Sequence, residues 1–150
     1  ELAIPEEIAL IDKKRCNVVI FGIPAVSHEA DIKAVSDLLM GIDAMSDFSC
    51  YRIGAAESPN RPIIVRFQSA SSQGQVITNA KKLKGQEQYN NISIKPDFTK
   101  RQRALNTQKE DALRADAITR NASMSIGEKN DYAWVVTGKP GNRHLAKKKK

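Results

Sequence analysis

Two short β-rich runs, each carrying arginine and each followed by a segment of helical periodicity, constrain the fold of this chain more than any other feature. They are residues 14–24 (KRCNVVIFGIP) and residues 61–67 (RPIIVRF). A further strand-like run follows each unit, at residues 48–53 and 91–95. The order is therefore β-α-β-β-α-β, which is the split βαβ pattern of a small ferredoxin-like sheet. We predict an α+β fold with a ferredoxin-like βαββαβ sandwich.

Both segments between the strands have the pattern of amphipathic helices. Ser27 can serve as the N-cap of the first, whose apolar residues recur at helical spacing: Ile32, Val35, Leu38, Leu39 and Ile42. A cap within residues 69–72 can start the second, before Gly85 ends it. Its core-facing residues are Val76, Ile77, Ala80 and Leu83.

We place a border between two domains at Pro96. The residues that follow, Thr99 to Gln102, have the form of a capping box, so a new helix should run from Lys100 to about Arg120. Residues 123–126 and 132–137 are expected to pair as a hairpin around a turn at 127–131. The predicted organisation is a lead-in helix or coiled-coil end (1–15), a main domain (16–95), a small basic C-terminal helix-plus-hairpin domain (96–138) and a basic tail (139–150).

The net charge of +7 is unevenly distributed along the chain. Residues 1–94 contain 10 Lys and Arg against 11 Asp and Glu, whereas residues 95–150 contain 14 against 6. This asymmetry favours a polyanionic partner. Nucleic acid is favoured over membrane because no basic amphipathic helix with bulky apolar residues accompanies the charge. No apolar run reaches the ~18 residues of a membrane helix, so we expect no membrane partner.

The chain offers no constellation suited to catalysis. His28 and His144 have no Cys, Asp or Glu at zinc-ligand spacing, and the phosphate-loop, serine-hydrolase and metalloprotease motifs are absent. Cys16 and Cys50 are expected to be reduced structural thiols of an intracellular protein. We therefore expect a protein that is not an enzyme and that uses no cofactor or metal.

The predicted sheet is of a kind that often binds RNA by stacking bases on aromatic residues of two central strands. Here the positions expected for those aromatics hold Val19, Pro62 and Ile64. Phe21 and Phe67 are expected in the core. The sequence therefore predicts no stacking platform and no sequence-specific readout by this face.

Arg66 is the first candidate for a phosphate contact. Both of its neighbours in the strand are predicted to face the core, so Arg66 projects from the opposite face, beside Ile64. It is either an exposed arginine paired with a carboxylate or a phosphate contact aided by Arg52 and Arg61 on adjoining strands. A guanidinium suits the second role because its planar fork binds phosphate oxygens bidentately.

The start of the predicted C-terminal helix is the second candidate. Lys100, Arg101 and Arg103 lie there, where free backbone N–H groups also attract phosphate. Arg114, farther along, is expected to pair with Glu110 on a mixed solvated face. The lysines at 147–150 could serve as a nuclear signal, a nonspecific clamp or a solubilising tail.

Taken together, four pieces resemble the nucleic-acid-binding half of the first-reading-frame protein of LINE-type retrotransposons. They are residues 15–24 (RCNVVIFGIP), 51–54 (YRIG), 61–67 (RPIIVRF) and 95–103 (KPDFTKRQR). Their order and spacing cover about residues 13–120. The stretch from Tyr132 to Gly138 is a weaker match.

The resemblance implies a non-standard RNA-recognition-type domain (RRM) without full stacking motifs, followed by a small basic domain. In that family the two domains form a cleft for single-stranded nucleic acid, mainly the element's own RNA, and the proteins act as RNA-packaging chaperones. Self-association is implied through a coiled coil N-terminal to this chain. The binding residues that carry over are Arg15, Arg52, Arg61, Arg66, Lys100, Arg101 and Arg103.

The leading hypothesis is a sequence-independent binder of single-stranded RNA, or of DNA, that works through phosphate contacts in a ribonucleoprotein. Its expected location is the cytoplasm, with the nucleus as a further site. The alternative is a protein–protein interaction module on an RRM-like fold, with arginines that bind carboxylates.

Overall fold

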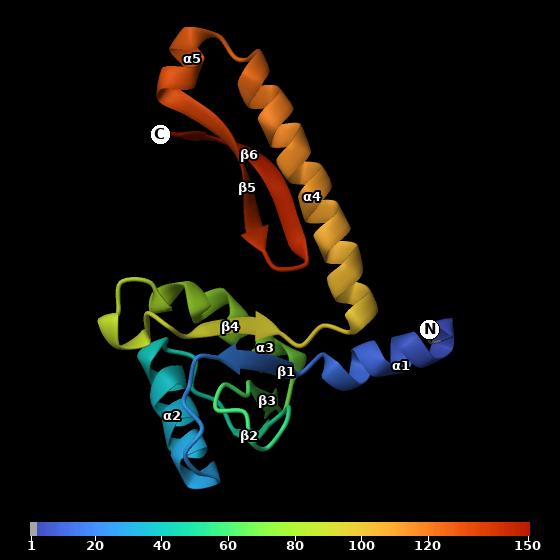
Figure 1. The fold of residues 1–150 in the computed structure, drawn as a ribbon, viewed down its shortest axis with the longest axis vertical. Coiled ribbons are helices and arrows are strands. Elements are labelled where there is room, and N and C mark those ends of the chain that lie inside the picture. The colour runs from blue at the N-terminus through green and yellow to red at the C-terminus, as the bar shows by residue number, and fades with distance from the viewer. Residues whose placement is uncertain (1–2) are drawn as a thin grey trace. The chain divides into compact units, whose positions relative to one another are not determined.

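The computed structural model describes residues 3–150, which form two compact units that meet in sequence between Thr99 and Lys100 (Figure 1). The helices of the first unit are α1 (Ile4–Lys14), α2 (His28–Gly41) and α3 (Ala70–Asn79), with 3-10 turns η1 (Ala80–Leu83) and η2 (Glu87–Tyr89). Its strands are β1 (Asn17–Phe21), β2 (Phe48–Arg52), β3 (Ile63–Phe67) and β4 (Ser93–Pro96). The second unit contains α4 (Lys100–Ser123), α5 (Ile126–Asp131), β5 (Tyr132–Lys139) and β6 (Asn142–Lys149).

The four strands of the first unit form one antiparallel sheet in the order β2-β3-β1-β4. In this register Val65 of β3 lies between Val18 of β1 and Cys50 of β2, and Ile20 of β1 lies opposite Ile94 of β4. The predicted α+β class is confirmed. The two outer strands, β2 and β4, are the edges of the sheet.

One face of this sheet is covered by helices and forms the core. Alternate strand residues point to it because successive side chains in a strand face opposite ways. They pack against the apolar stripe of α2, which includes Val35, Leu38 and Leu39, and against Val76 of α3. The strand residues in this core are Val18, Ile20, Cys50, Ile63, Val65, Phe67 and Ile94.

A serine hydroxyl caps the N-terminus of each helix that covers the sheet, α2 and α3, as the sequence predicts for Ser27. The Ser27 Oγ accepts a hydrogen bond from the backbone N–H of Ala30, and the Ser69 Oγ accepts one from Ser72, each at 3.1 Å. Each bond satisfies a backbone donor that the helix itself cannot pair.

Gly22 ends β1 in a conformation that needs glycine. Its φ is +99°, and a Cβ built there would lie 2.0 Å from the carbonyl oxygen of Asn91. Only a residue without a side chain permits this close approach between the end of β1 and the segment that leads into β4.

In the second unit, α4 runs beside the β5–β6 hairpin (Figure 1). Trp134 of β5 is one point of attachment between them. The Asn121 side chain of α4 both donates to the Trp134 carbonyl, at 3.0 Å, and accepts from the Trp134 N–H, at 2.7 Å. The Arg120 guanidinium lies 4.6 Å from the centroid of the Trp134 ring. These contacts explain why a helix with few buried apolar residues can still hold the hairpin.

Two predictions for this unit are wrong. Residues 126–131 form helix α5 behind a Ser125 cap and not a hairpin turn, and the hairpin lies farther along the chain, between 132 and 149. The expected tail at 139–150 is largely strand β6, with Lys147 opposite Trp134. Lysine is depleted in strands, which is why a lysine run did not indicate one. Here the Lys147 ammonium is 5.4 Å from the Tyr132 ring centroid and 3.2 Å from Glu128.

Throughout residues 3–150, every helix is too short or too polar to cross a membrane.

Candidate functional site

The sheet face opposite the core carries cations and aromatic rings together. In the register of the sheet, Tyr51, Ile64, Val19 and Lys95 form one row across all four strands. Arg66 lies between Ser49 and Asn17 in the adjacent row on one side, and Phe21 lies opposite Ser93 on the other. We call these nine residues the open face. It contains two cations and no carboxylate.

Arg66 is where the sequence predicted it, exposed and on the face opposite Val65 and Phe67. Its Nε donates a long hydrogen bond of 3.4 Å to the Asn17 side chain, whose amide in turn donates to Asp97 at 3.1 Å. Within residues 3–150 no carboxylate forms an ion pair with Arg66. Its terminal nitrogens are therefore available to an anion from outside the chain.

Lys95, which the sequence analysis did not select, supplies the second cation of the open face. It is exposed, and its ammonium lies 5.5 Å from the centroid of the Phe21 ring. The alternation of side chains along a strand could have identified it. Lys95 follows the core residue Ile94 in β4, so its side chain points away from the core.

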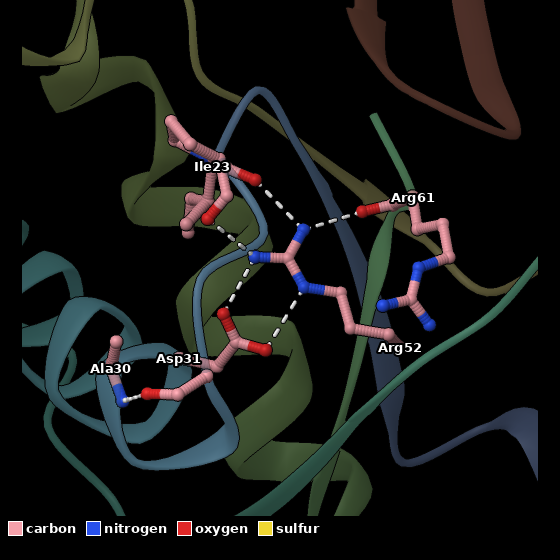
Figure 2. A network of polar contacts seen from close by, with 7 residues as sticks. Ile23, Ala30, Asp31, Arg52 and Arg61 are labelled. Atoms are coloured by element: carbon pink, nitrogen blue, oxygen red, sulfur yellow. Dashed lines mark hydrogen bonds and ion pairs between the residues drawn. The ribbon is translucent and has the colours of Figure 1, made fainter. Parts of the chain in front are cut away.

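Arg52 is not on this face, which corrects the sequence prediction. It follows Cys50 by two residues in β2, so its side chain points to the helix-covered side and is only 7% exposed. Figure 2 shows its guanidinium enclosed by the carboxylate of Asp31 and by main-chain oxygens from two other segments. The Arg52 side chain therefore lies across the sheet from Arg66.

Every N–H donor of Arg52 is used inside the protein. Nε donates a hydrogen bond of 2.9 Å to one carboxylate oxygen of Asp31, and Nη2 donates one of 2.6 Å to the other. Nη1 donates to the carbonyls of Ile23 and Arg61, at 2.7 and 2.6 Å, and Nη2 also donates to the carbonyl of Pro24 at 3.0 Å (Figure 2). A guanidinium has five donors, so none remains for phosphate. Arg52 joins α2, the loop after β1 and the start of β3.

The ion pair also sets the charge state of its carboxylate. The hydrogen bonds from Arg52 lower the pKa of Asp31 below the ordinary aspartate value of 3.8, against the opposing effect of burial. Asp31 is therefore ionised at neutral pH, and the pair adds no net charge to the surroundings.

Arg61 lies at the edge of a hollow of about 580 Å³ that is open beside this ion pair. The hollow is also lined by Tyr51 of the open face and by Ser27 and His28 at the start of α2. The Arg61 Nε is buried and has no hydrogen-bond partner within the described residues. An unpaired buried donor of this kind is unfavourable.

The other predicted binding residues are exposed but lie outside the open face. Arg15, just after α1, has its guanidinium 3.9 Å from the Asp12 carboxylate. Lys100, Arg101 and Arg103 lie in the first turn of α4, in the second unit. Arg114 pairs with Glu110 and Asp111, at 3.3 and 3.1 Å, and the prediction of a solvated face is confirmed.

Sequence reasoning also missed the rings of the open face. Phe21 was expected in the core but is 39% exposed, and Tyr51 is 50% exposed, whereas Phe67 is buried as predicted. Phe21 follows Val19 and Tyr51 precedes the core-facing Arg52, so the alternation that defines the core places both rings on the other side.

No protein-family model matches this chain, and no curated protein matches it by sequence.

Proposed function

We propose that the open face of the first unit binds single-stranded nucleic acid, RNA in the first place, through contacts to phosphate. The observation that carries the proposal is that two exposed cations of the open face, Arg66 and Lys95, form no ion pair with a carboxylate within residues 3–150. The Asp97 carboxylate at the rim of this face is held by Asn17 and Lys14. Arg61 is outside this face and lines the hollow at the β2 edge, which Tyr51 and Glu57 also line. Phosphate is the ligand that suits a guanidinium fork and a neighbouring ammonium.

The proposal includes a finer description of the fold. The strand order β2-β3-β1-β4, with α2 and α3 on one face, supports a ferredoxin-like arrangement of the RNA-recognition type for residues 16–95. This description agrees with the resemblance to the first-reading-frame proteins of LINE-type retrotransposons. For this chain we therefore propose a role in the packaging of RNA, without a catalytic step.

Salt dependence tests the phosphate contacts directly. Binding of the full chain to a labelled single-stranded RNA of mixed sequence would be measured by fluorescence anisotropy over a range of salt concentrations. For single strands each neutralised phosphate contributes about −0.7 to the slope of log affinity against log salt. We expect Arg66→Gln to weaken binding and to make the slope shallower by about that amount.

Lys33→Gln is the matched control, because it also removes one positive charge from the first unit. Lys33 is 78% exposed on α2 and pairs with Asp37, away from the open face. An equal loss of slope in both variants would mean that only net charge matters, and the open face would lose its role. No binding at low salt by a folded chain would refute the proposed function and would favour the alternative, a module for an acidic protein partner.

A further inference from the structure

We infer that Tyr51 and Phe21 each stack against a base of the bound strand, so that the open face contacts bases as well as phosphates. This inference rests on the proposed function. The positions at which an RNA-binding sheet normally presents its aromatics hold aliphatic residues here, Val19 and Ile64, so the two rings form a platform of different layout. Any base has a face that can stack, so such contacts tolerate any sequence.

The exposure of the rings is the first support. Tyr51 is 50% exposed and Phe21 is 39% exposed, although both belong to strands of a sheet whose other face is a closed core. Between them lies an apolar floor, in which Ile64 is 4% exposed and Val19 is half-buried. Rings that flank such a floor present flat apolar surface to a ligand.

The spacing of the rings is the second support. Tyr51 is two strands away from Val19 in the register, and Phe21 lies two residues beyond Val19 along β1. Strand separation and rise per residue then put the two positions about 12 Å apart. Positions this far apart on one face can each be contacted by a different base of the same strand.

Charge complementarity identifies the occupant as nucleic acid. The Lys95 ammonium lies over the Phe21 ring, 5.5 Å from its centroid, and Arg66 is the second cation of the open face. The phosphates of a strand whose bases stack on this face can pair with these two cations, which an apolar peptide would not use.

The test compares two labelled oligomers of equal length with the full chain. One is single-stranded RNA of mixed bases, and the other has the same sugar–phosphate backbone with abasic units only. We expect the native chain to bind the mixed-base oligomer more tightly. Tyr51→Ser should weaken that binding about 5- to 100-fold, which is the range for loss of one base stack. The same variant should leave binding to the abasic oligomer unchanged, which also shows that it is folded.

Three further variants sharpen the result. Tyr51→Phe keeps the ring and should bind the mixed-base oligomer as the native chain does. Met45→Ser removes an apolar side chain of similar exposure, 55%, outside the open face, and should have no effect on either oligomer. Phe21→Ser should act as Tyr51→Ser does.

The outcomes separate this inference from the proposed function. Equal, salt-sensitive binding of both oligomers by the native chain would overturn base stacking and leave phosphate binding intact. A mixed-base preference that survives both serine substitutions would also overturn it. Failure of the native chain to bind either oligomer at low salt would overturn the proposed function itself.

Discussion

Replacement of Arg52 by methionine should destabilise the first unit without a direct loss of phosphate contacts. Methionine keeps most of the volume of the side chain but has no donor. The change leaves the Asp31 carboxylate, whose side chain is only 8% exposed, without its partner. It also removes the donor to three main-chain carbonyls, those of Ile23, Pro24 and Arg61.

The magnitude follows from the kind of pair that is broken. Removal of one partner from a buried, hydrogen-bonded ion pair costs about 3–5 kcal/mol, because a charge is left buried and uncompensated. Most domains have a total stability of about 5–15 kcal/mol, so the loss is a large share. The double variant Arg52→Met/Asp31→Asn should lose less than Arg52→Met alone, since it leaves no unpaired carboxylate.

Urea denaturation of the full chain, followed by far-UV circular dichroism and by peptide-resolved hydrogen exchange over residues 17–67, measures this loss. Hydrogen exchange is needed because it reports on the first unit separately. The reasoning would be refuted if Arg52→Met changed the free energy of unfolding by less than about 1 kcal/mol while it weakened RNA binding as Arg66→Gln does. That result would mean that the Arg52 donors reach phosphate after all.

Three other predictions concern pH, glycine and the C-terminal strand. Because the pKa of Asp31 is lowered in the folded protein, its pair contributes stability above the unfolded pKa of about 3.9, and this contribution is lost as the pH falls through the lower folded value. Urea titrations at pH 7 and at pH 3 should therefore show a smaller difference between the native chain and Arg52→Met at the lower pH. Gly22→Ala should destabilise by about 1–3 kcal/mol, whereas Gly74→Ala, in an unobstructed helical position, should stabilise by about 0.5–1 kcal/mol; equal effects on the urea midpoint would contradict the close approach at the end of β1. Deletion of residues 139–150 should leave β5 unpaired and shift the fluorescence of the single tryptophan to that of a solvated ring, while an unchanged spectrum would mean that these residues are the tail first predicted.

Much of the first unit could be predicted from local pattern. Alternation placed Arg66 away from the core, and helical spacing selected Val35, Leu38 and Leu39 as core residues of α2. The same alternation, applied to β2, would have placed Arg52 on the helix side. Burial of a charge there is unfavourable unless it has a partner, and the partner of Arg52, Asp31, lies on another element, α2.

The second unit was predicted less well, because its strands lack an apolar pattern. Trp134 is attached to α4 through a backbone-to-side-chain pair with Asn121, and Lys147 is held by a ring and a carboxylate. Such contacts leave no periodic signal in the sequence.

The sequence by itself determined the element order of the first unit, the apolar stripes that build its core and the charge of the C-terminal third. These are properties of neighbouring residues, and burial of one face explains them. Only the tertiary structure decided which arginine is free. The acceptors of Arg52 lie 9 to 29 residues away in the chain, and no local pattern shows that they converge on one guanidinium. The open face is likewise a product of strand pairing, which brings two cations and two rings from four strands to one side of the sheet.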